Sequence, residues 1–184
     1  MFGGGKLAPA FTAQAAGTIA QRAGLDRPAV RAARFLVVAE SGVGPAHPFS
    51  GEKLSPVLAL YRADDFAGAA ALADQLLGYQ GAGHSVGLHT GVPDRALQLG
   101  LTLPVCRVIV NQAHCFATGG SFDNALPFSL SMGCGTWGGN SISDNLTYRH
   151  FLNITRVVHP LPAASVREPT DAEFFAGYRA KHGL

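Results

Sequence analysis

The chain has 184 residues, of which 47% are hydrophobic and 14% are charged, and its formal net charge is +2. This length and apolar content are enough to bury the core of one globular domain. The Lys and Arg residues are scattered rather than gathered into a stripe, so we expect no nucleic-acid partner.

No segment of the sequence is typical of a membrane protein. Polar side chains such as Lys6, Gln21 and Asp26 interrupt the alanines near the start, unlike the continuous apolar stretch of a signal peptide. Elsewhere no run reaches the roughly 18 uninterrupted apolar residues that a membrane helix needs. We therefore expect a cytoplasmic protein with no membrane partner.

Helical and strand patterns alternate along the first part of the chain. Periodically apolar or Ala-rich stretches predict helices at 9–23, 65–79 and 93–99. Gly24 is placed to end the first helix, and Asp64 is the expected N-cap of the second. Apolar runs predict strands at 35–38, 57–61, 86–89 and 105–110. This alternation predicts an α/β fold with a largely parallel sheet and covering helices.

The rest of the chain is less regular. Residues 111–145 are rich in Gly, Ser and Asn with little periodicity, and a loop of that length inside a domain is usually functional. An apolar segment at 153–158 predicts a further strand, which the prolines after it stop. A capping box formed by Thr170 and Glu173 predicts a last helix, which runs to His182.

One glycine motif looks like a dinucleotide-binding fingerprint, but its context argues against that function. The segment from Gly133 to Gly138 satisfies G-x-G-x-x-G. The fingerprint requires a strand before it, a helix after it and an acidic residue about 20 positions on. Here no helix pattern follows, and Val157 and Val158 occupy the acidic position. We predict a glycine-rich loop that turns tightly beside Trp137.

Several segments together resemble the C-terminal half of the CoA-acylating aldehyde dehydrogenases. They occur in the family's order at 48–56 (PFSGEKLSP), 61–66 (YRADDF), 81–85 (GAGHS) and 133–141 (GCGTWGGNS). Within that family, the loop at 111–124 is most similar to the acylating sulfoacetaldehyde dehydrogenases. The resemblance implies the catalytic-domain fold of the aldehyde dehydrogenases, with an oligomerisation strand.

The resemblance also implies a division of the chain. Residues 1–147 would form a portion of the thioester-forming catalytic domain, and residues 163–184 the C-terminal helix. Residues 148–162 would be the oligomerisation strand, which adds to a neighbouring subunit's sheet; the alternative is pairing within the same chain.

The family's reaction implies cofactors and substrates. Its members form a thiohemiacetal on a cysteine, transfer hydride to NAD or NADP, and pass the acyl group to coenzyme A. The expected substrates are therefore CoA and a small aldehyde, with sulfoacetaldehyde as the candidate. The expected protein partners are further copies of the chain or an upstream N-terminal portion.

Two residues match family positions that carry chemistry. Glu52 matches the glutamate that binds the nicotinamide ribose, and a carboxylate can accept both ribose hydroxyl protons. Its alternative interpretation is a solvated loop acid. His84 matches the histidine near the nucleophile and is a candidate base for the thiol, because imidazole exchanges protons near neutrality. Its alternative is a histidine that caps the start of a strand.

The loop at 111–124 matches the segment that lines the family's aldehyde pocket. His114 and Thr118 are candidates to bind an anionic group such as a sulfonate, and Phe116 is a candidate to close the tunnel. The alternative for His114 is an ordinary polar loop residue.

The cysteines do not stand where the family keeps its nucleophile. That cysteine and the dinucleotide-binding domain lie upstream of the matched region. The spacing of Cys106, Cys115 and Cys134 contains no C-x-x-C pair, so we expect reduced thiols and no metal site. Cys106 reads as core and Cys134 as part of the glycine motif. Cys115, beside His114, is the candidate substitute nucleophile.

Three functions remain open. The first is the C-terminal part of an acylating aldehyde dehydrogenase, which would be inactive without an N-terminal portion. The alternative is a non-catalytic assembly module or inactive remnant that pairs with full-length dehydrogenase subunits. The third is a hydrolase that uses Cys115 and His114.

Overall fold

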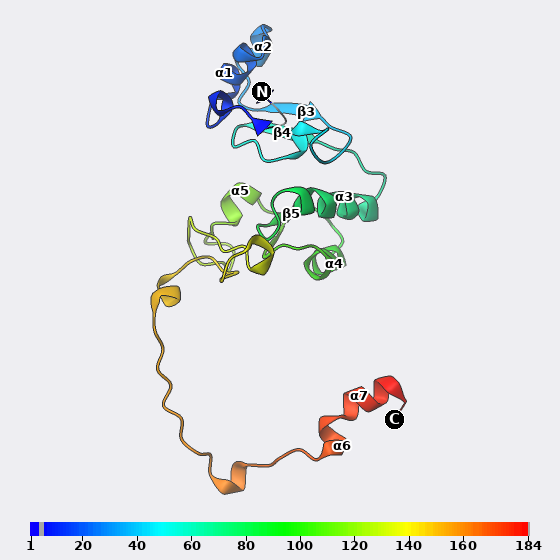
Figure 1. The fold of residues 1–184 in the computed structure, drawn as a ribbon, viewed down its shortest axis with the longest axis vertical. Coiled ribbons are helices and arrows are strands. Elements are labelled where there is room, and N and C mark those ends of the chain that lie inside the picture. The colour runs from blue at the N-terminus through cyan, green and yellow to red at the C-terminus, as the bar shows by residue number, and fades with distance from the viewer. Residues whose placement is uncertain (4–5, 184) are drawn as a thin grey trace. The chain divides into compact units, whose positions relative to one another are not determined.

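The computed structural model of the chain describes residues 1–3 and 6–183, which divide into two compact units, Met1–Phe151 and Leu152–Leu184 (Figure 1). The strands of the first unit are β1 (Phe2–Gly3), β2 (Lys6–Leu7), β3 (Leu36–Ala39), β4 (Val57–Leu60), β5 (Val86–Leu88) and β6 (Val108–Val110). Its α-helices are α1 (Ala16–Arg22), α2 (Pro28–Arg31), α3 (Phe66–Tyr79), α4 (Asp94–Thr102) and α5 (His114–Ala117).

The strands pair in twos. β3 lies parallel to β4, with Leu36 opposite Val57, and β5 lies parallel to β6, with Val86 opposite Val108. The strands β1 and β2 form a short antiparallel pair. The α/β class and the parallel pairing expected from the sequence are therefore confirmed. Among the described residues, the parallel strands form two separate pairs and not one continuous sheet.

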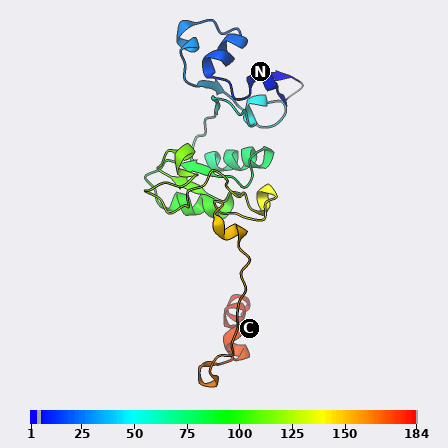
Figure 2. The ribbon, with the colours of Figure 1, turned by 90° about the vertical axis from the view of Figure 1, so that its left-hand side faces the viewer.

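The core beside the candidate site lies between α3, α4 and the β5–β6 pair. Leu99, Leu103 and Val105 are each no more than 6% exposed. Apolar side chains from α3 and from β5 pack against them, and Figures 1 and 2 show both helices next to β5. Full burial of one such side chain contributes about 2 kcal/mol, so this cluster fixes the strands that carry the site.

The helix expected at 9–23 was wrong in its extent. A 3-10 turn at Pro9–Phe11 is separated from α1 by Ala13, whose φ is 55°. That left-handed conformation interrupts any right-handed helix. The N-cap expected at Asp64 was also wrong by one residue, because the carboxylate of Asp65 accepts the hydrogen bond from the Gly68 amide at 2.7 Å.

The long irregular segment folds as predicted, without an extended helix or strand. It contains α5, a 3-10 turn at Thr136–Gly138 and an isolated antiparallel bridge between Met132 and Asn145. No helix follows the glycine motif, so the fingerprint interpretation fails. Gly83, with φ of 90°, packs directly against the backbone of Cys134. A side chain at position 83 would overlap that carbonyl, which explains the glycine.

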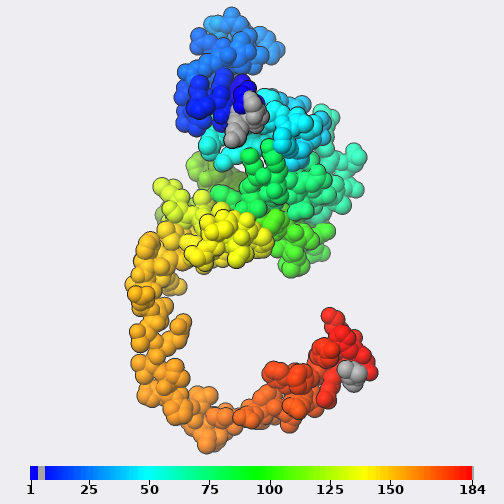
Figure 3. All heavy atoms as spheres, viewed as in Figure 1, coloured from blue at the N-terminus to red at the C-terminus, as the bar shows by residue number. Residues whose placement is uncertain are grey.

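The second unit is described by itself. Residues 152–162 carry no secondary structure, so the strand expected at 153–158 pairs with nothing within the described chain. Figure 3 shows this stretch as a thin tract of atoms (orange). The capping box of Thr170 and Glu173 is confirmed, but the last helix is divided at Phe175 into α6 (Asp171–Phe174) and α7 (Ala176–His182).

Among the helices of the described residues, none has the length and apolar character needed to cross a membrane.

Candidate functional site

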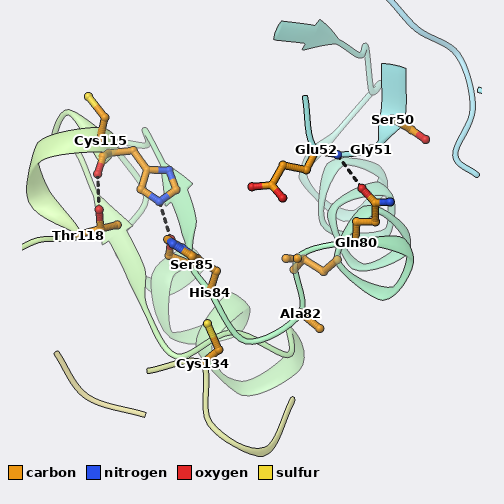
Figure 4. Close-up of a pocket in the computed structure, with 13 residues that line it drawn as sticks. Ser50, Gly51, Glu52, Gln80, Ala82, His84, Ser85, Cys115, Thr118 and Cys134 are labelled. Carbon is orange, nitrogen blue, oxygen red and sulfur yellow. Dashed lines mark hydrogen bonds between the residues drawn. The ribbon is translucent and has the colours of Figure 1, made fainter. Parts of the chain in front are cut away.

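A cleft of about 1060 Å³ in the first unit brings together residues that are distant in the sequence (Figure 4). Four of the five predicted site residues line it: Glu52, His84, His114 and Thr118. Phe116 does not line this cleft. It is 77% exposed and lines a neighbouring pocket of about 450 Å³, and its role in closing the tunnel stays a prediction.

Glu52 lies on the loop between the 3-10 turn Pro48–Ser50 and β4. Its backbone amide donates a 2.7 Å hydrogen bond to the side-chain oxygen of Gln80, which follows the end of α3. Figure 4 shows the Glu52 carboxylate pointing into the cleft, towards the side on which Ser85 lies. The main chain is thus held while the carboxylate stays free to accept hydrogen bonds.

Lysine and serine side chains fix the rest of this loop. The Nζ of Lys53 donates 2.7 Å hydrogen bonds to the carbonyls of Phe49 and Gly51. The Gly44 amide donates to Ser50 Oγ at 3.0 Å. Burial lowers the pKa of Lys53, against the opposing attraction of Glu40 and Glu52. The Lys53 ammonium therefore binds carbonyls of its own loop and does not face a ligand in the cleft.

His84 is exposed on the segment that leads into β5. The preceding residue, Gly83, is held by the segment that leads into β6, because its amide donates a 2.6 Å hydrogen bond to the Pro104 carbonyl. The Nδ1 of the His84 ring lies 2.6 Å from Ser85 Oγ. One ring nitrogen is therefore engaged, and Nε2 is the nitrogen left for a ligand.

His114 begins α5 and joins the same hydrogen-bonded group. Its Nε2 lies 2.8 Å from Ser85 Oγ. Burial, and secondarily the positive charge that His84 can carry, lower the pKa of His114. His114 is therefore neutral near pH 7 and offers an anion a hydrogen bond but no charge.

Thr118 is 5% exposed, and its hydroxyl donates to the His114 carbonyl at 3.1 Å. An anion needs a donor, and this proton is already committed within α5. Among the described residues that line the cleft there is also no Lys or Arg. The binding of a sulfonate by His114 and Thr118 stays a prediction, and any charge that neutralises it must come from elsewhere.

Arg107 is a residue that the sequence reasoning missed. It is 6% exposed and precedes β6. Its guanidinium donates to Asn145 Oδ1 at 2.8 Å and to backbone carbonyls at 3.0–3.3 Å. These carbonyls belong to His84, Gly133 and Ser143. Arg107 therefore ties the His84 segment to Gly133, at the start of the glycine motif, and to Ser143, which follows that motif.

Ser85 and Gln80 were also missed. Both contact a predicted residue, Ser85 through its hydroxyl and Gln80 through its amide oxygen. Ser85 belongs to the recognised GHS motif, and that membership was the signal that could have identified it. Gln80 carried no signal, because its role depends on a partner 28 positions away.

The thiols of Cys115 and Cys134 both line the cleft. Cys115 is exposed and Cys134 is half-buried. Burial raises the pKa of Cys106, which is half-buried and not deep in the core as expected. No hydrogen bond joins Cys115 to an imidazole among the described residues, so the structure gives the substitute-nucleophile hypothesis no base.

Comparisons with known proteins agree on one family. No protein-family model matches the chain. It is 59% identical over 178 residues to an acylating sulfoacetaldehyde dehydrogenase of Cupriavidus necator, a match that covers 97% of this chain and 36% of that protein. It is 36% identical over 157 residues to an acetylating succinate-semialdehyde dehydrogenase of Clostridium kluyveri, covering 85% of this chain and 34% of that protein.

A solved structure supports the same relationship. The crystal structure of an acetylating aldehyde dehydrogenase from Geobacillus thermoglucosidasius superimposes with a TM-score of 0.77 at 35% identity, covering 88% of this chain and 36% of that one. The chain thus spans little more than a third of the length of these relatives. Over nearly its whole length the chain matches the C-terminal part of the acylating aldehyde dehydrogenases.

Proposed function

We propose that this chain supplies the C-terminal part of the catalytic domain of an NAD(P)-dependent, CoA-acylating aldehyde dehydrogenase that acts on sulfoacetaldehyde. The observation that carries the proposal is the cleft that gathers Glu52, His84 and His114 from three separate segments. The 59% identity to a sulfoacetaldehyde dehydrogenase supports the choice of aldehyde. The nucleophilic cysteine and the dinucleotide-binding domain would come from an N-terminal portion like that of the relatives.

Glu52 fits the role of holding the nicotinamide ribose. Its carboxylate is exposed to the cleft, and no hydrogen bond or ion pair to it occurs among the described residues. A carboxylate accepts hydrogen bonds from two vicinal hydroxyls at once. The nicotinamide cofactor, when bound, supplies the hydride acceptor.

His84 fits the role of general base towards the CoA thiol. The thiol proton moves to Nε2 of the ring, and the resulting thiolate attacks the acyl group carried on the enzyme's cysteine. The acyl–cysteine bond breaks, and the cysteine leaves as a thiolate while acyl-CoA forms. The exposure of His84 gives a bulky thiol access to the ring.

A chimera tests the proposal. This chain replaces the 178 matched residues in the Cupriavidus necator relative. We expect NAD(P)H formation that depends on both sulfoacetaldehyde and CoA, together with sulfoacetyl-CoA in the product. The chain alone should show neither. A folded chimera that lacks the activity would reject the proposal. A chimera that prefers succinate semialdehyde would reject sulfoacetaldehyde as the substrate.

One observation favours the second candidate, an assembly module. The second unit exposes Ile154, Val157 and Val158, which are between 65% and 84% exposed. Such a segment is suited to adding a strand to another subunit's sheet. Co-expression with the tagged full-length relative tests this candidate. Recovery of the relative without this chain would exclude it, and co-purification that survives Val157→Asp would count against this segment as the contact.

A further inference from the structure

Ser85 Oγ stands between two imidazole rings. It lies 2.6 Å from His84 Nδ1 and 2.8 Å from His114 Nε2, and all three side chains line the same cleft. A serine hydroxyl carries one proton and accepts through its lone pairs. It can therefore donate to only one of the rings, and the other ring must donate to it. The protonation of one ring thus fixes the orientation of the hydroxyl towards the other.

We propose that Ser85 is a positioning residue that links His84 and His114 into one hydrogen-bonded unit and sets the tautomer of His84. In this unit Ser85 donates to a bare Nε2 of His114 and accepts from the Nδ1–H of His84. The Nε2 of His84 is then the unprotonated nitrogen that faces the cleft. The assignment of that nitrogen as the base towards CoA rests on the proposed function.

The surroundings of His114 are compatible with this polarity. Its ring packs against Gly87 of β5, where a Cβ atom would lie 3.0 Å from Nδ1. Burial keeps the ring neutral by lowering its pKa. A neutral His114 can accept from Ser85 through Nε2, whereas a protonated one cannot.

The charged and titratable groups around the unit are few. From the cleft wall, Glu52 faces it across the opening, with Cys115 on α5 and Cys134 on the glycine segment. From behind, Arg107 holds the His84 carbonyl at 3.3 Å. The more buried ring of His114 is the costlier place for a positive charge, because burial lowers its pKa.

In this arrangement His84 can take up a proton at Nε2 without breaking its hydrogen bond to Ser85. When His84 Nε2 takes a proton from a thiol, the ring becomes an imidazolium whose Nδ1–H still donates to Ser85. The positive charge stays at the end nearest the thiolate, because placing it on the more buried His114 costs desolvation. Without Ser85, Nδ1 loses its acceptor and the tautomer of His84 is no longer fixed.

Ring-nitrogen NMR of the chain tests the unit without any activity. The seven histidines are labelled with ¹⁵N, and His84→Gln and His114→Leu assign the two signals. We expect a protonated Nδ1 and a bare Nε2 on His84 at high pH. Ser85→Ala should convert His84 to a mixture of tautomers, Ser85→Thr should keep the original one, and the exposed control Ser41→Ala should change nothing.

His114→Leu provides a second variant, because it removes the acceptor for the Ser85 proton and should loosen the His84 tautomer in the same way. An Nε2–H tautomer in the native chain, or one unaffected by Ser85→Ala, would overturn the proposal.

Kinetics in the active chimera separate the two proposals. Ser85→Ala should lower kcat/KM for CoA about 10- to 100-fold and shift its pH profile, while Ser85→Thr restores both. Unchanged kinetics beside a changed tautomer would overturn the positioning role. If the chimera itself were inactive, the proposed function would fail, and the NMR result would still decide whether the hydrogen-bonded unit exists.

Discussion

The Nε of Arg107 donates a 2.8 Å hydrogen bond to the amide oxygen of Asn145, 38 positions further along the chain. Asn145 is 1% exposed, and its amide nitrogen donates to the carbonyls of Thr118 at 3.0 Å and Pro127 at 2.8 Å. The side chains of Arg107 and Asn145 thus connect irregular segments around the cleft, where regular strand pairing is not available to connect them. Because each polar atom of Asn145 is paired, the buried pair can be stable.

Loss of Asn145 should therefore destabilise the chain strongly. Asn145→Ala leaves a buried guanidinium nitrogen and the buried Thr118 carbonyl without this partner and also removes the bond to the Pro127 carbonyl, so we expect the free energy of unfolding to fall by about 3 kcal/mol. Urea denaturation measures the change. The matched control Asn153→Ala, at an exposed position, should change it by less than about 0.5 kcal/mol. Equal stability of the two variants would contradict the role of the pair.

The lowered pKa of His114 predicts a dependence of stability on pH. Its pKa is ordinary in the unfolded chain and lower in the folded one, so between these values the unfolded state binds more protons. This contribution should be constant above pH 6.5, fall as the pH drops below that value, and level off below the folded pKa.

Denaturation of the chain and of His114→Leu at about pH 8 and about pH 5 measures this slope. We expect a smaller loss of stability in the variant. His159→Gln, at an exposed position, is the control and should keep the slope of the native chain. A slope that His114→Leu leaves unchanged would reject the burial of a neutral ring.

Two Gly→Ala substitutions should have different effects, because the added Cβ atom meets the His114 ring at position 87 and no atom at position 78. Gly87→Ala places a Cβ atom 3.0 Å from His114 Nδ1 and 3.4 Å from Cγ, so the ring must shift by a few tenths of an ångström, which should disturb its hydrogen bond to Ser85. Gly78→Ala, in α3, meets no atom within 4 Å and should stabilise the chain by about 0.5–1 kcal/mol. The His84 tautomer, read by NMR, should change in the first variant alone. A changed tautomer in Gly78→Ala would show that the probe reports general perturbation.

Gln80 should matter for the cofactor through Glu52. Gln80→Ala removes the acceptor for the Glu52 amide, which frees the loop that carries the carboxylate. The loss of a hydrogen bond worth about 1 kcal/mol should raise the KM for the nicotinamide cofactor about fivefold in the chimera, with little change in kcat. Gln75→Ala, on the exposed surface of the same helix, is the control. An unchanged KM would mean that Glu52 needs no such support.

Proteolysis should report on the second unit. Arg156 lies in the stretch without secondary structure and is exposed in the single chain. We expect trypsin to cut after Arg156 first in dilute monomer, and the cut to slow when the chain assembles through residues 148–162. Mass spectrometry identifies the cut, and light scattering reports the assembly state. Rapid cleavage within a stable oligomer would exclude this segment from the interface.

The sequence predicted the parallel strand pairs, α3 and the capping box, because each depends on local patterns of apolar and capping residues. It failed where one residue overrides a pattern, as Ala13 does with its positive φ. Family motifs predicted Glu52 and His84 as site residues, and the structure places both in one cleft. Gln80 and Arg107, which support them, could not be predicted, because each acts through a partner more than 20 positions away. Ser85 could have been identified, because it belongs to the same motif as His84.

The close approach of Gly83 to the backbone of Cys134 has a consequence for the evolution of this locus. A side chain at position 83 meets a carbonyl that cannot move aside, whereas position 78 is open to solvent. A gene copy released from selection would accumulate substitutions at both positions alike. In a lineage that still uses the folded chain, changes at 78 should persist while changes at 83 are removed. Natural variation at these two codons therefore distinguishes a working gene from a decaying one.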